Sequence, residues 1–264
     1  MLLALWATLA GWAFLSLHLA VPALRVGLYL LPISLYLWVL VDAVLLAKRS
    51  PADYVLRRYN RVWAYALAVL LVGVVAHPAF TSFVKARIAR AYSAPSDAMR
   101  PTLAPGDYLL ASRGVPSSIE RGSILVWHSP EGIEIIQRAV ALPGDTVEMR
   151  AKSLFVNGRA VREPYVRHID PNADVADPQM LWQREFLAGR SRESYRPTRD
   201  TWGPLAVPAG HYLLLGDNRD NSYDGRYRGF VRRDWITGQP VWVYLSRDPE
   251  TGRFRWSRSG MSIR

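Results

Sequence analysis

Three long apolar runs fill the first third of the chain, over residues 1–24, 26–47 and 62–84. Each run reaches the roughly 20 residues that an α-helix needs to cross the hydrocarbon layer of a bilayer. The first run lacks a charged leading segment and is longer than the apolar core of a signal peptide. The pattern therefore predicts a membrane anchor of three transmembrane α-helices over residues 1–84.

The segment between the second and third runs sets the expected orientation of this anchor. Residues 48–61 contain one acidic residue, Asp53, and five basic ones: Lys48, Arg49, Arg57, Arg58 and Arg61. Short loops rich in Lys and Arg stay on the cytoplasmic side of a membrane. We therefore expect residues after 84 to lie outside the cytoplasm, although Lys85, Arg87 and Arg90 favour the opposite orientation more weakly.

The remaining chain, residues 85–264, has the pattern of a mainly β domain. Short runs with β-type composition cover 108–111, 124–128, 133–142, 146–150, 154–156, 211–215 and 241–245. Turn residues such as Pro-Gly-Asp and Asn-Gly separate several of these runs, as in successive antiparallel strands. Residues 165–205 are polar and irregular, and we expect them to form an insertion on the rim of the domain.

Composition narrows the possible chemistry. The chain contains no cysteine, which excludes disulfides, thiol catalysis and cysteine metal sites, and we expect no cofactor and no metal. The net charge of +11 would suit a membrane-tethered nucleic-acid binder. The basic residues are scattered rather than clustered, however, so lipid headgroups or solubility explain them as well. We therefore do not expect a nucleic-acid partner.

Four ordered segments carry a family resemblance. They read PSDAMRPTL over 95–103, QRAVALPGD over 137–145, WGPLAVPAGHY over 202–212 and GDNRDNSYDGR over 216–226. Together they resemble the bacterial type I signal peptidases (signal peptidase I). The resemblance implies a membrane serine protease with a Ser-Lys dyad, which removes signal peptides after Ala-x-Ala at the outer face of the cytoplasmic membrane. Its expected partners are exported preproteins and the lipid bilayer.

The resemblance fails at the two positions that carry the chemistry. The family's nucleophilic serine corresponds to Ala98, and its general-base lysine corresponds to Gln137. A methyl group cannot attack a carbonyl, and an amide cannot accept a hydroxyl proton at neutral pH. By the same resemblance Ser96 helps to form the oxyanion hole and Ser222 orients the base. The resemblance also implies structural support from the pair Asp224 and Arg226 and from Asp217 and Asn218.

Other residues are poor replacements for the missing dyad, since a dyad requires near-ångström positioning. Ser93 and Ser96 flank the nucleophile position but are offset from it. The remaining candidates are distant in sequence or better explained as structural residues, and they are Lys85, Lys152, His128, His168 and His211.

Two interpretations follow from these departures. In the first, the chain is a relative that no longer cleaves and that binds exported chains, alone or together with an active peptidase or an assembly component. In the second, the chain is a genuine signal peptidase that carries engineered inactivating substitutions.

Overall fold

The structure is a computed structural model that describes residues 89–170, 174–189 and 192–263, together with five isolated residues before position 68. The chain divides into two compact units, 1–90 and 91–264. The three predicted membrane helices and the loop 48–61 lie outside the described ranges, apart from those isolated residues. Within the described ranges, no helix has the length and apolar character needed to cross a membrane.

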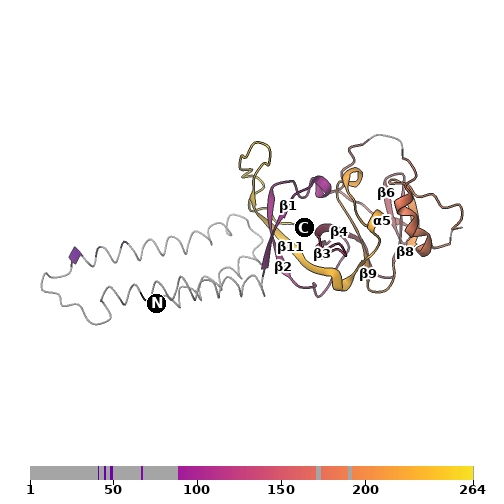
Figure 1. Ribbon diagram of the computed structural model, residues 1–264, viewed down its shortest axis with the longest axis horizontal. Coiled ribbons are helices and arrows are strands. Elements are labelled where there is room, and N and C mark those ends of the chain that lie inside the picture. The colour runs from indigo at the N-terminus through magenta and orange to yellow at the C-terminus, as the bar shows by residue number, and fades with distance from the viewer. Residues whose placement is uncertain are drawn as a thin grey trace. The chain divides into compact units, whose positions relative to one another are not determined.

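The second unit is built on two antiparallel sheets (Figure 1). The larger sheet has the strand order β1-β2-β11-β3-β4-β9-β10, and the smaller has the order β7-β6-β5-β8. The strands of the larger sheet are β1 (Ala89–Ala94), β2 (Asp107–Arg113), β3 (Ile124–His128), β4 (Glu134–Ala141), β9 (His211–Leu215), β10 (Val231–Arg232) and β11 (Ile236–Ser246). Those of the smaller sheet are β5 (Thr146–Arg150), β6 (Ser153–Val156), β7 (Arg159–Ala160) and β8 (Trp202–Ala206). The prediction of a mainly β domain is confirmed.

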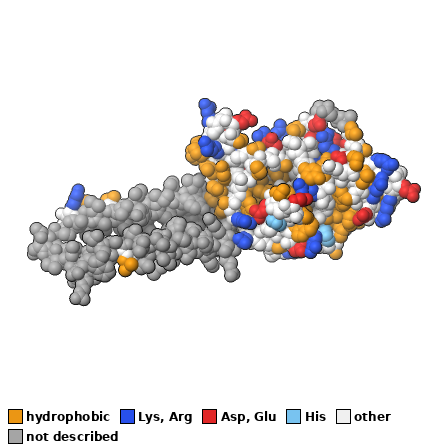
Figure 2. All heavy atoms as spheres, in the orientation of Figure 1, with side chains coloured by type: hydrophobic (Ala, Val, Ile, Leu, Met, Phe, Trp, Pro, Cys, Tyr) orange, Lys and Arg blue, Asp and Glu red, His pale blue; other side chains and the backbone are white. Residues whose placement is uncertain are grey.

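Short helical turns connect these strands at the places that matter for the site. They are η3 (Asp97–Met99), η4 (Pro178–Phe186), η5 (Arg219–Asn221), α5 (Gly225–Arg228) and η6 (Arg233–Trp235). Figure 2 shows basic and acidic side chains interspersed over the visible face of this unit's described part. That distribution fits the scattered charge seen in the sequence.

The prediction for residues 165–205 is wrong in part. The segment contains η4 and enters β8, and both contribute to a buried cluster with β5, β6 and β9. Met180 is fully buried, and Trp182 and Phe186 pack edge-to-face against Phe230. A nine-residue turn of mixed polarity has neither a strand period nor a long helical period. Its order comes from a few large side chains that pack against distant strands.

Candidate active-site pocket

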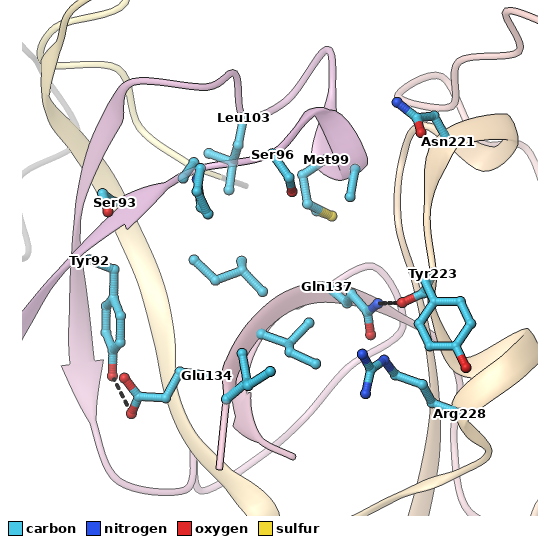
Figure 3. Close-up of a pocket in the computed structure, with 16 residues that line it drawn as sticks. Tyr92, Ser93, Ser96, Met99, Leu103, Glu134, Gln137, Asn221, Tyr223 and Arg228 are labelled. Atoms are coloured by element: carbon cyan, nitrogen blue, oxygen red, sulfur yellow. Dashed lines mark hydrogen bonds between the residues drawn. The ribbon is translucent and has the colours of Figure 1, made fainter. Parts of the chain in front are cut away.

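A pocket of about 360 Å³ lies where the η3 loop faces strand β4 (Figure 3). Ser96 and Ala98 line it from the η3 side, and Gln137 lines it from β4. Tyr223 and Arg228 complete the wall from the segment that follows η5. The fold thus brings Ser96, Ala98 and Gln137, three of the predicted site residues, into one cavity.

The η3 loop is fixed from both sides. Met99 and Leu103 anchor it in the core, with exposed fractions of 4% and 0%. On the other side, the Asn218 backbone N–H donates to the Ala98 carbonyl oxygen at 3.0 Å, and Asn218 Nδ2 donates to the Asp97 carbonyl oxygen at 3.1 Å. Ala98 is therefore held at a defined place, although its methyl group has no polar chemistry.

Gly216 shows how closely Ala98 and Ser222 approach each other. A Cβ atom at Gly216 would lie 2.6 Å from the Ala98 carbonyl oxygen and would overlap the Ser222 hydroxyl oxygen. Real Cβ atoms do not reach such separations from backbone atoms, so this position accepts only glycine in the present geometry. The glycine lets the segment after β9 pass directly between the η3 loop and Ser222.

Gln137 occupies a buried polar niche, with 2% of its surface exposed. Trp127 Nε1 donates to Gln137 Oε1 at 3.2 Å, and Gln137 Nε2 donates to the Tyr223 carbonyl oxygen at 3.5 Å. Both ends of the amide are thereby used. The neighbouring Ser222 hydroxyl oxygen is buried and makes no hydrogen bond to any described residue.

A buried ion pair joins β4 to the segment after β9. Arg138 donates to both carboxylate oxygens of Asp217, from Nε at 2.9 Å and from Nη2 at 2.7 Å. The Thr102 hydroxyl donates to the same carboxylate at 2.5 Å. The sequence analysis named Asp217 but assigned no role to Thr102 or Arg138, although both lie within the motif segments 95–103 and 137–145. Their contacts fix the three segments of the pocket relative to one another.

A second buried pair stabilises the loop that carries Ser222. Arg226 Nε lies 2.9 Å from Asp224 Oδ1, and both side chains are at most 1% exposed. The other Asp224 oxygen accepts from the Gly216 backbone N–H at 3.0 Å, while Arg226 Nη2 donates to the Arg219 carbonyl oxygen at 2.7 Å. Each charge therefore has several partners, which a buried ion pair requires to persist.

Comparison with known proteins assigns the chain to a family. The family model described as signal peptidase, peptidase S26, matches residues 62–245. The chain belongs to this family. It is 34% identical to a signal peptidase I of Pseudomonas aeruginosa over 64% of this chain and 70% of the relative. It is 30% identical to a signal peptidase I of Pseudomonas fluorescens over 78% of each chain. A crystal structure of a signal peptidase I from Enterococcus faecalis matches with 30% identity and a TM-score of 0.32, covering 47% of this chain and 97% of that one.

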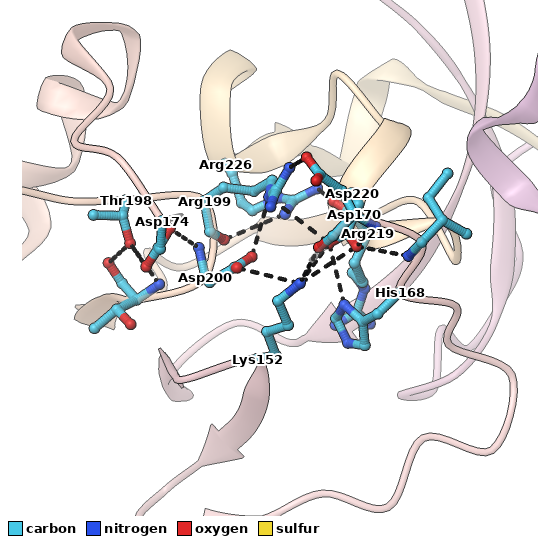
Figure 4. A network of polar contacts seen from close by, with 12 residues as sticks. Lys152, His168, Asp170, Asp174, Thr198, Arg199, Asp200, Arg219, Asp220 and Arg226 are labelled. Atoms are coloured by element: carbon cyan, nitrogen blue, oxygen red, sulfur yellow. Dashed lines mark hydrogen bonds and ion pairs between the residues drawn. The ribbon is translucent and has the colours of Figure 1, made fainter. Parts of the chain in front are cut away.

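The one lysine of the described β domain, Lys152, forms its contacts away from the central pocket (Figure 4). Lys152 Nζ donates to the Asp170 carbonyl oxygen at 2.9 Å and lies 3.4 Å from carboxylate oxygens of both Asp200 and Asp220. Lys152 does not line the pocket. The ammonium group therefore has a structural role between loops, and the geometry gives it no path to Ala98.

Asp220 is the centre of that network. Burial opposes ionisation of its carboxyl group, but several interactions outweigh burial. They are backbone N–H donors at Asp170 and Ile169, the His168 ring and the charge of Lys152. The pKa of Asp220 consequently lies well below its usual range. His168 is thus a partner of Asp220, and neither His128 nor His211 lines the pocket.

Proposed function

We propose that this member of the signal peptidase family binds the signal peptides of exported preproteins without cleaving them. The observation that carries the proposal is the pair Ala98 and Gln137, which stand where the family resemblance places nucleophile and base. The side chain of Ala98 has no oxygen, and the side-chain amide of Gln137 has no basic lone pair at neutral pH. A pocket of about 360 Å³ nevertheless lies beside both residues.

Strand addition is the mode of binding that the surrounding structure favours. Strand β1 forms one edge of the larger sheet, and Ser93 at its end lines the pocket together with Ile133 and Ile135. An extended peptide can pair its main chain with such an edge while alternate side chains enter shallow pockets. Small side chains fit best beside Ala98, because Met99 and Leu103 close the floor of the pocket.

The pocket also has opposite charges at its two ends. Glu134 lies beside Tyr92 at one end, and Arg228 lies beside Tyr223 at the other (Figure 3). Tyr92 and Glu134 are within hydrogen-bond reach, at 3.5 Å, and the Arg228 guanidinium stacks over the Tyr223 ring at 4.7 Å. A bound peptide is thereby given a preferred direction, since charge placement fixes register more than it adds affinity.

Fluorescence anisotropy with a labelled signal peptide tests binding. We expect a peptide with small residues at its cleavage site to bind more tightly than one in which those residues are large. Substitution of Ile133→Arg should weaken binding, since Ile133 lines the pocket and is 54% exposed. Val115→Arg is the matched control, because Val115 is 42% exposed and lies outside the pocket. Equal binding of both peptides, or equal loss in both variants, would contradict the proposal.

The second candidate is a working signal peptidase whose dyad positions have been substituted. The buried Ser222 hydroxyl without a described partner favours it, because an amine at position 137 could use that group. The coding sequence of the source gene distinguishes the two candidates: serine and lysine codons at positions 98 and 137 would establish substitution.

A further inference from the structure

A second cavity, of about 320 Å³, lies at the start of η4, where residues 196–197 pass beside it. Two arginines, Arg184 and Arg196, line it, and we call it the arginine pocket. Its other walls are mainly apolar and come from Ala176, Pro178, Leu181 and Pro197. None of these residues lines the central pocket, so the two cavities are separate.

The two guanidinium groups converge on one oxygen atom. Arg184 Nη2 and Arg196 Nη1 both donate to the Tyr195 carbonyl oxygen, at 3.3 Å and 3.1 Å. Within the described ranges, neither group has a carboxylate oxygen within 4.0 Å. Arg199 differs, because it forms ion pairs with both Asp170 and Asp200. Two like charges are thus held together without an ion-pair partner among the described residues, which is unfavourable until an anion joins them.

The one acidic residue that lines the arginine pocket accepts a hydrogen bond from the backbone, while one arginine N–H donor has no acceptor. Asp177 lines the cavity, but its Oδ1 atom caps η4 by accepting from the Gln179 backbone N–H at 2.9 Å. Arg184 Nε is buried and has no hydrogen-bond partner among described residues. A buried donor without an acceptor destabilises a structure. The arginine pocket therefore holds two guanidinium charges against one carboxylate that pairs with neither of them, and it lacks an acceptor for Arg184 Nε.

The geometry points to a phosphate group as the ligand. A carboxylate has two oxygens, which one guanidinium fork satisfies, whereas a phosphate offers three or more acceptors to two forks at once. A phosphate monoester also carries nearly two negative charges at neutral pH, which matches two arginines. The volume exceeds that of the anion, and the apolar walls fit the organic part of an ester. Free phosphate and a lipid headgroup share this chemistry.

Thermal unfolding of the full chain in an uncharged detergent tests the assignment, with ionic strength held constant by chloride. Inorganic phosphate should raise Tm in a saturable way, as expected for a ligand of the folded state. Arg196→Gln should weaken the apparent affinity about tenfold or more, since it removes a charge-assisted contact. Arg196 is exposed, so this variant should fold; Arg184→Gln should show the same loss. Arg192→Gln is the matched control, because Arg192 is exposed and outside the pocket.

Each outcome bears on the proposal. Loss of the phosphate response in Arg196→Gln, with retention in Arg192→Gln, supports it. A response to inorganic phosphate identifies a soluble ligand, and a response only to short-chain phosphatidic acid, a phosphate monoester, with diacylglycerol as control, identifies a lipid headgroup. An equal response in all variants, an equal response to acetate, or no response to either phosphate source would overturn it.

Discussion

The double substitution Ala98→Ser with Gln137→Lys provides the sharpest test of the pocket chemistry. The serine would supply a hydroxyl on the fixed η3 loop, and the lysine would supply an amine on β4. Neither single change should produce cleavage, because a hydroxyl without a base is weakly nucleophilic and an amine alone has nothing to activate. The double variant should process a preprotein. Such non-additivity is the mark of groups that act as one unit.

The burial of position 137 sets the magnitude of the change in stability. Gln137 is 2% exposed, so a lysine there would lose hydration and its pKa would fall by about 3 units, toward neutrality. At pH 7 this corresponds to a destabilisation of about 4 kcal/mol. The Trp127 Nε1–H group, which now donates to the Gln137 amide, favours a neutral amine as well, since an ammonium has no lone pair to accept with.

The sign of the pH dependence follows from the same shift. Between about pH 7 and pH 10 the unfolded lysine binds a proton and the folded one does not, so stability should rise with pH by about 1.4 kcal/mol per unit. Gln137→Met is the matched control, because it removes the amide without adding a titratable group. Its loss of stability should not depend on pH over this range.

Processing of a preprotein by all four forms measures activity, and urea unfolding at pH 7 and pH 9 measures stability. A pH-independent stability of Gln137→Lys relative to Gln137→Met would refute the argument from burial. Processing by the unaltered chain that disappears on Ser96→Ala or Ser93→Ala would show that the nucleophile lies elsewhere and that the chain is a working enzyme.

Three further outcomes are expected. Reporter fusions after positions 55 and 120 should report cytoplasmic and extracytoplasmic locations respectively; a cytoplasmic signal from the second would overturn the predicted orientation. Asp220→Asn should flatten the acid limb of the stability curve measured by urea unfolding between pH 7 and pH 3, because a depressed carboxyl pKa stabilises above about pH 4 and this stabilisation is lost as pH falls. Gly216→Ala should destabilise the domain by about 1–3 kcal/mol and weaken peptide binding, because its Cβ would overlap the Ala98 carbonyl oxygen; unchanged urea unfolding and peptide anisotropy would contradict this.

Strand positions could be predicted where local pattern and tertiary packing agree. The runs 124–128, 146–150 and 211–215 coincide with β3, β5 and β9, since turn residues bound them and their apolar residues are buried. The sheet order could not be predicted, because β11 lies between β2 and β3 although about 120 residues separate it from each. The packing of η4 could not be predicted either, because it depends on partners such as Phe230 that lie far away in sequence.

The site was predictable to the extent that its residues lie in recognisable segments. Ala98, Gln137 and Ser96 line one pocket, as their positions in the family motifs imply. The sequence does not predict which other residues each of these side chains contacts. Nothing local indicates that Trp127 would bond the Gln137 amide across the β3–β4 pair, or that the Thr102 hydroxyl would reach Asp217. Such contacts join segments far apart in the chain and exist only after the sheet has formed.

A buried ion pair and a buried hydroxyl group near the pocket differ in what they contribute to the fold. Breaking the buried Arg138–Asp217 pair by removing one partner would leave an uncompensated charge, with a loss of about 3–5 kcal/mol. The contribution of this ion pair to stability therefore explains its presence, whether or not the chain cleaves peptides. The Ser222 hydroxyl is different, because it is buried without a described partner and contributes no hydrogen bond to the fold. We expect a substitution of Ser222 to affect the double variant, in which an amine stands at position 137, and to leave the stability of the original chain almost unchanged.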